Sequence, residues 1–120
     1  MIEIIPELPD NIVAAKAHGK ITAEDYKKTF IPVIEQKLAA HKKIRLLYQL
    51  GDDFSGYSLA AVFQDAKVGL AHWNGFDKIA VVTDVHWVAD ACKFFGAFIP
   101  CPVMVFPNAK LDEAKAWIEG

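Results

Sequence analysis

A buried strand that runs directly into a polar turn is the feature that most constrains the fold of this 120-residue chain. Residues 44–50 are apolar except for Arg45 and Gln49, as expected for a strand with helices on both faces. A polar turn is predicted at residues 51–58, followed by a helix at residues 59–73. Such a helix presents free backbone N–H groups at the carboxyl end of the strand, where open α/β sheets usually bind ligands or partners. The stretch therefore predicts an α/β fold and a binding site within residues 51–58.

The remaining sequence alternates between strand and helix patterns. Two short strands are predicted at residues 2–5 and 11–18, and the prolines between them indicate an amino-terminal hairpin. Strands that alternate with helices require right-handed crossovers and a largely parallel sheet, to which the hairpin adds an antiparallel edge. We therefore expect a single α/β domain over residues 1–120, with a mixed, mostly parallel five-stranded sheet and four helices in the order β-β-α-β-α-β-α-β-α. The further strands are expected at residues 78–83 and 102–106, and the further helices after Thr22 and at residues 85–98 and 109–119.

The first helix has a clear start and an internal interruption. Thr22 is expected to be its N-cap, with Asp25 three residues later completing a capping box. Pro32 removes one backbone donor and clashes with the preceding turn, so we expect a bend near Lys28 or Thr29. The buried stripe of this helix is predicted to comprise Tyr26, Phe30, Ile34 and Leu38.

Composition and charge exclude several classes of protein. The chain is 53% hydrophobic and carries 13 basic and 15 acidic residues, a formal net charge of −2. Nucleic-acid binders concentrate lysine and arginine against phosphates, so this balance excludes a nucleic-acid partner. The amino terminus lacks the features of a signal peptide and no stretch stays apolar long enough to cross a bilayer, so we expect a cytoplasmic protein. Cys92 and Cys101 lie in apolar runs and are expected to be small buried side chains rather than a disulfide or a metal site.

Three segments carry a resemblance to a known family. They are residues 53–57 (DFSGY) in the polar turn, residues 78–84 (KIAVVTD) in the next strand and residues 113–118 (EAKAWI) in the last helix. Together with the order of strands and helices, these segments resemble the SpoIIAA-like proteins of the STAS group, which are structurally related to lipid-carrying CRAL-TRIO domains. The resemblance covers essentially the whole chain and implies a STAS fold with a binding or regulatory role.

The resemblance also implies a regulatory site. In anti-sigma-factor antagonists the second helix opens with Asp-Ser-Ser-Gly-Leu-Gly, and a partner kinase phosphorylates the serine before the first glycine, which corresponds to Ser55. The chain departs from that pattern at Phe54, which places a bulky aromatic group on the surface the kinase must approach, and at Ser58. Ser55 or Ser58 is alternatively an N-cap of the predicted helix. Asp53, Ser55 and Ser58 are thus the expected contacts to a protein partner, and Phe54 and Tyr57 are expected ligand contacts.

The predicted helices at residues 59–73 and 85–98 carry more apolar residues than a sheet can cover. On the later helix only His86, Asp90 and Lys93 form a polar stripe, whereas a docked surface helix needs an apolar face only about 100° wide. Three explanations remain open: the helices pack on each other and on the sheet, they form a homodimer, or they contact a hydrophobic ligand or a membrane surface. Aromatic side chains favour the bilayer interface, while the scarcity of basic residues disfavours it. The expected apolar contacts are Phe63, Trp73, Trp87, Phe94, Phe95 and Phe98.

Groups that could carry catalysis are few. Asp84 and His86 lie where a strand becomes a helix. They could meet His72, Asp52 and Asp53 at one edge of the sheet as acid and base. Asp84 is equally suited to cap the helix, and His18 and His41 are expected to be structural at the ends of a strand and a helix. The sequence lacks a phosphate-binding loop, a nucleophile elbow and a zinc-protease motif. We therefore expect no enzyme activity, no cofactor and no metal.

These observations converge on a non-catalytic binding domain. We expect it to bind a hydrophobic, lipid-like ligand, the inner face of the membrane or a second copy of itself through the predicted second and third helices. The alternative is a module that binds a regulatory protein partner and is switched by phosphorylation of Ser55.

Overall fold

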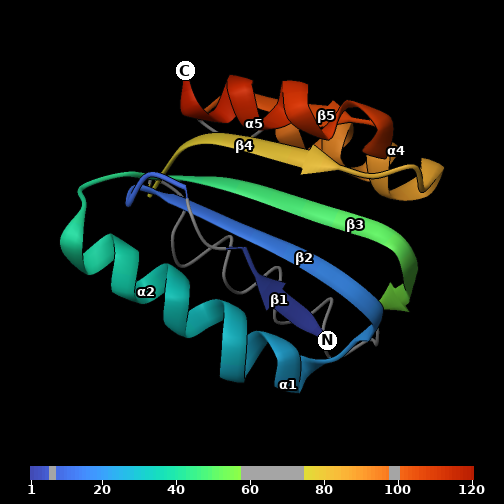
Figure 1. Cartoon of the computed structure of the whole chain (residues 1–120), viewed down its shortest axis with the longest axis horizontal. Helices are drawn as coiled ribbons and strands as arrows, with labels where there is room; N and C mark the ends of the chain where they lie inside the picture. Colours follow the sequence, from blue (N-terminus) through green and yellow to red (C-terminus); the bar gives the residue numbers. More distant parts are fainter. Residues whose placement is uncertain (6–7, 58–74, 98–100) are drawn as a thin grey trace.

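A mixed five-stranded sheet forms the centre of the protein (Figure 1). The computed structural model describes residues 1–5, 8–57, 75–97 and 101–120. The strands lie in the order in which they occur in the sequence; the first two are antiparallel and every later neighbour is parallel, which confirms the expected sheet and its antiparallel edge. The strands are β1 (Ile2–Ile4), β2 (Ile12–Ile21), β3 (Ile44–Tyr57), β4 (Phe76–Val82) and β5 (Val103–Phe106).

Part of the predicted architecture lies outside the described residues. This applies to the predicted helix at residues 59–73, and with it to Ser58, Phe63, His72 and Trp73, and also to Phe98. Among the residues that the structure describes, no helix has both the length and the apolar character needed to cross a membrane.

The first helical region begins as expected and contains one irregular turn. It comprises α1 (Ala23–Asp25), the π-helical segment η1 (Tyr26–Phe30) and α2 (Ile31–Ala40). Thr22 Oγ1 accepts a hydrogen bond from the Asp25 backbone N–H, and the Asp25 carboxylate accepts one from the Thr22 N–H at 2.8 Å, which confirms the capping box. Pro32 in the first turn of α2 offers no N–H to the carbonyl four residues earlier. The chain widens over η1 instead, where Ile31 N–H bonds to the Tyr26 carbonyl five residues back.

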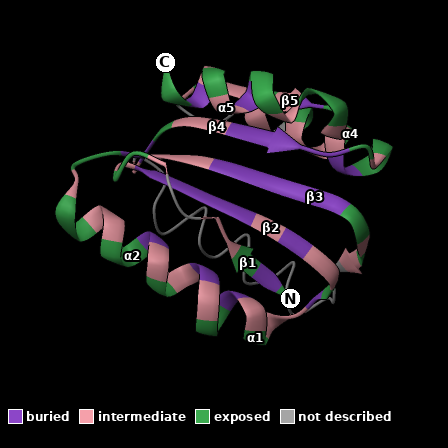
Figure 2. Ribbon diagram, in the orientation of Figure 1, coloured by how far each residue is buried: buried purple, intermediate pink, exposed green. Residues whose placement is uncertain are grey.

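Helices cover both faces of the sheet (Figure 2). Successive residues of β2 and β3 alternate between the two cores that lie on these faces. The larger core lies beneath α1–α2 and α4 (His86–Gly96), where Phe30 contacts Tyr48 edge to face with ring centroids 5.5 Å apart. The smaller core lies beneath α5 (Leu111–Glu119) and contains Leu47 of β3. Both cysteines are half-buried and pack against the larger core.

The two polar interruptions of the apolar run in β3 both fasten later elements to the sheet. Arg45 Nη1 donates to the Ile118 carbonyl at the end of α5 at 2.8 Å, and Gln49 donates to Asn108 at 2.9 Å. Lys78 of β4 donates to the Trp117 carbonyl and lies over the Trp117 ring, 5.1 Å from its centroid. Cations at the carboxyl end of α5 satisfy carbonyls that the helix leaves without partners.

Candidate functional site

The predicted polar turn after Leu50 is a bulged continuation of β3, so the expectation of a turn over residues 51–57 was wrong. Pairing with β2 passes from Ala17 opposite Leu50 to Gly19 opposite Phe54, and residues 51–53 form a bulge opposite His18. A second irregularity leaves Ser55 without a pairing residue on β2, since adjacent Gly19 and Lys20 pair with Phe54 and Gly56. Free backbone groups at the end of β2 extend the ladder to Tyr57, and this pairing overrides the turn preference of the local sequence.

Two glycines allow this bulged extension. Gly19 has φ 61° and Gly56 has φ 136°, both in regions that side-chain-bearing residues rarely adopt. The expected site residues therefore do not share one surface: Asp53 and Ser55 are exposed, whereas Phe54 is half-buried against the larger core. Ser55 lies within β3 and caps no helix in the described part of the chain.

His18 joins this bulge to the edge of the sheet. Its Nδ1 lies 2.8 Å from Asp53 Oδ2 and its Nε2 lies 2.7 Å from Glu3 Oε1. The hydrogen bonds with Glu3 and, to a smaller extent, with Asp53 raise the pKa of His18 above its usual 6.5. The hydrogen bond from His18 lowers the pKa of Asp53. The sequence pattern places His18 at the end of a strand and carries no signal for its contact with Glu3, because that contact depends on the register between β1 and β2.

Asp84 accepts its hydrogen bonds from Asn108, which lies two residues after the end of β5. Its carboxylate accepts hydrogen bonds from the Asn108 backbone N–H and from Asn108 Nδ2, both at 3.1 Å. Asn108 Nδ2 also donates to the Leu50 carbonyl at 3.0 Å, and Asn108 Oδ1 accepts from buried Gln49. The start of α4 is satisfied differently, since Thr83 Oγ1 accepts from the Val85 N–H at 3.0 Å. The contacts described for Asp84 are thus with Asn108 rather than with the start of α4, in contrast to the expected capping role.

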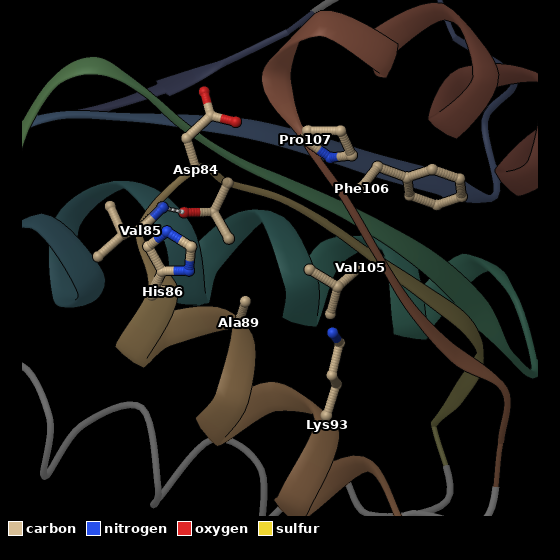
Figure 3. A pocket seen from close by; sticks show the side chains of 9 residues that line it. Asp84, Val85, His86, Ala89, Lys93, Val105, Phe106 and Pro107 are labelled. Atoms are coloured by element: carbon tan, nitrogen blue, oxygen red, sulfur yellow. Dashed lines mark hydrogen bonds between the residues drawn. The ribbon is translucent and has the colours of Figure 1, made fainter.

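A hollow of about 370 Å³ opens beside this network, between the start of α4 and the end of β5 (Figure 3). The exposed polar side chains of His86 and Lys93 line the hollow, and Ala89 and Val105 form an apolar part of its wall. Asp84 and His86 both line the hollow, but both carboxylate oxygens of Asp84 accept hydrogen bonds from Asn108, which suits an anchoring carboxylate better than a general base. Among the residues that the structure describes, no group of three or more His, Cys, Asp or Glu could hold a metal ion.

The outward face of α4 is the most apolar exposed surface among the described helices. Trp87 is 58% exposed and Phe94 is 64% exposed, whereas Val88 on the inward face is only 6% exposed. Trp87 and Phe94 are seven residues apart, so they lie on one side of α4 and are separated by roughly 10 Å along its axis. The structure thus brings together two of the expected apolar contacts; Phe95 also belongs to α4.

Comparison with known proteins assigns the family. The chain matches the SpoIIAA-like family over residues 12–119. It belongs to the SpoIIAA-like family. A crystal structure of an uncharacterized protein from the DUF3478 family with a SpoIIAA-like fold, from Shewanella loihica PV-4, is similar with a TM-score of 0.77 and 29% sequence identity. The match covers 98% of this chain and 93% of the other. No curated protein matched the chain.

Membership of the SpoIIAA-like family accounts for the fold and agrees with the resemblance carried by residues 53–57, 78–84 and 113–118. It is consistent with a non-catalytic binding or regulatory domain and specifies neither a ligand nor a partner. What the domain binds is therefore inferred from the side chains exposed on its surface.

Proposed function

We propose that this SpoIIAA-like protein is a non-catalytic binding domain that docks on a lipid surface through the outward face of α4. The observation that supports this most directly is the joint exposure of Trp87 and Phe94 on one side of one helix. A folded protein gains stability by burying such groups, so two large aromatic side chains that stay more than half exposed on the same face favour a binding surface that buries them further. Phe63, Trp73, Phe95 and Phe98 remain predicted contributors to the same contact.

The chemistry of α4 favours a bilayer interface over an enclosed lipid cavity. Tryptophan and phenylalanine both enter the interfacial region of a bilayer, where the indole N–H stays hydrated while the ring is buried. Lys93 next to Phe94 is exposed and could meet a phosphate head group. The hollow beside α4 is open and has a partly polar lining, which does not match the apolar enclosure that a lipid tail requires.

The aromatic pair would supply a measurable part of the binding free energy. Fully burying such a side chain gives roughly 1.5–3 kcal/mol, and somewhat over half of each side chain is still exposed, so the pair is worth about 2–4 kcal/mol. Because 1.4 kcal/mol corresponds to tenfold, removing both rings lowers vesicle partitioning on the order of a hundredfold. The electrostatic contribution of Lys93 is smaller and is screened by salt.

The experiment is vesicle flotation of the wild type, the double variant Trp87→Ser and Phe94→Ser, and the control Met104→Ser. Met104 is also an exposed apolar residue, at 42%, but it lies on β5 rather than on α4. We expect the wild type and the control to float with phospholipid vesicles and the double variant to stay unbound with its circular dichroism unchanged. Absence of wild-type flotation with both neutral and partly anionic vesicles refutes the proposal. A dimer in light scattering that dissociates in the double variant would instead assign the face to self-association.

A second candidate function rests on the position of Ser55. We infer that a serine in an exposed, extended bulge is accessible to a kinase, which fits a module that binds a regulatory protein partner and is switched by phosphorylation. Asp53 and Ser58 would then belong to the recognition surface. Co-expression with a kinase encoded nearby should give a phosphorylated species that Ser55→Ala abolishes. If Ser55→Asp leaves the affinity for every captured partner unchanged, the switch is excluded.

A further inference from the structure

His18 sits between carboxylates from two different strands. Both ring nitrogens are engaged, with Asp53 of β3 on one side and Glu3 of β1 on the other, at 2.8 and 2.7 Å. Both carboxylates are more than half exposed, while the His18 side chain is 21% exposed. An ionised carboxylate only accepts hydrogen bonds, so both contacts are satisfied at once only when the ring carries two N–H groups, as imidazolium.

Loss of one proton breaks this symmetry. Neutral imidazole has one N–H, and its other nitrogen presents a lone pair, which repels a carboxylate oxygen at hydrogen-bond distance. One of the two carboxylates must then move away or the ring must turn. The cluster can hold both strands in one protonation state and only one of them in the other.

The bulge is less regularly paired than β1. β1 is held to β2 by regular pairing over Ile2–Ile4 and by two flanking backbone hydrogen bonds, Ile5 N–H to the Ala14 carbonyl and His18 N–H to the Met1 carbonyl. Residues 51–53, in contrast, lie where the register between β2 and β3 is interrupted. The contact from His18 to Asp53 is therefore the connection most easily lost on deprotonation.

We propose that His18 is a proton-controlled clamp: as imidazolium it ties the bulge at residues 51–53 to the edge of the sheet, and in its neutral form it releases Asp53. The consequence is that pH sets the conformation in which the segment containing Ser55 is presented. This device goes beyond the lipid-docking function proposed for α4, because it involves other strands and does not require a membrane.

The neighbouring charges set the direction of the response. Lys16, on the same strand as His18, lies beside the bulge and stabilises the ionised form of Asp53. The Met1 ammonium donates to the His18 carbonyl and lies 3.4 Å from Asp25. Because Glu3 and Asp53 raise the pKa of His18, the clamp is closed below pH 6.5 and opens as pH rises through the raised pKa. It also opens in acid, as pH falls below 3.8 through the lowered pKa of Asp53.

The test is an NMR titration of the full chain that follows the His18 ring and the amides of residues 51–55 together. We expect the bulge amides to shift with the same midpoint as the His18 ring, above pH 6.5, and to lose protection from hydrogen exchange beyond that midpoint. In His18→Gln the amide shifts should lose this titration. In the control His41→Gln, which changes a histidine that contacts Asp10 instead, the titration should remain.

A second variant keeps the test decisive if His18→Gln does not fold. Glu3→Gln leaves the bulge untouched but removes one of the charges that favour imidazolium, so it should move the ring and bulge midpoints to lower pH by the same amount. Bulge amides that do not follow the ring in the wild type, or a bulge midpoint that does not move in Glu3→Gln, would overturn the clamp.

Discussion

The side chain of Asn108 makes several hydrogen bonds that should stabilise the folded protein, and Asn108→Ala tests this. The side chain donates to the Leu50 carbonyl and to Asp84, and accepts from Gln49, which is 7% exposed. Losing the two donated bonds costs about 1 kcal/mol each, and leaving the buried Gln49 amide without an acceptor adds about 1–2 kcal/mol. We therefore expect a loss of about 3–4 kcal/mol in the free energy of unfolding.

The same loss can be read as a melting temperature. For a chain of 120 residues the unfolding entropy is about 0.25 kcal/mol/K, so 3–4 kcal/mol lowers Tm by roughly 12–16 °C. The assay is urea denaturation at constant m-value together with thermal melting. Exposed Lys110, two residues away, provides the control, and Lys110→Ala should stay within about 0.5 kcal/mol of wild type.

A double-mutant cycle separates the cost of an unpaired amide from the loss of packing. Gln49→Leu in the Asn108→Ala background removes the buried donor that lost its acceptor, so it should be at least 1 kcal/mol less destabilising there than in the wild type. Additive effects of Gln49→Leu and Asn108→Ala, or an Asn108→Ala variant within about 0.5 kcal/mol of wild type, would show that the hydrogen bonds of Asn108 do not stabilise the fold.

Three further predictions follow from other parts of the fold. Thr22→Ala should cost about 1 kcal/mol, measured by denaturation, because the Asp25 N–H loses its acceptor, while Thr22→Ser should retain most of the stability. Gly56→Ala should destabilise by about 1–3 kcal/mol although the added Cβ meets no atom within 4 Å, because φ 136° strains any residue with a side chain; a neutral effect would contradict the bulge geometry. Hydrogen bonds from Lys37 and His41 lower the pKa of Asp10 from 3.8 to about 2. The stability that the ionised Asp10 contributes is therefore present above pH 3.8 and is lost as pH falls through about 2. NMR should show that midpoint, and Asp10→Asn should remove this part of the acid destabilisation.

Local sequence determined the parts of the protein that depend on near neighbours in the chain. The capping box at Thr22 and the irregular turn before Pro32 follow from contacts within four or five residues. The four-residue spacing of Tyr26, Phe30 and Ile34 likewise indicates which face of the helix is buried. The alternation of strands with helices likewise determined the parallel sheet, because right-handed crossovers leave few topologies. The exposure of Trp87 and Phe94 was also foreseeable, since α4 has more apolar residues than one face can bury.

The tertiary structure alone decided what lies across the sheet. Residues 51–57 have the composition of a turn, but the open end of β2 pairs with them, and a ladder bond satisfies backbone groups that a turn would leave to water. Asp84 pairs with Asn108 and His18 pairs with Glu3 and Asp53 over separations of 15 to 35 residues, which no local pattern encodes. Register between strands therefore determines which charges meet, and it arises from the packing of the whole sheet rather than from any one segment.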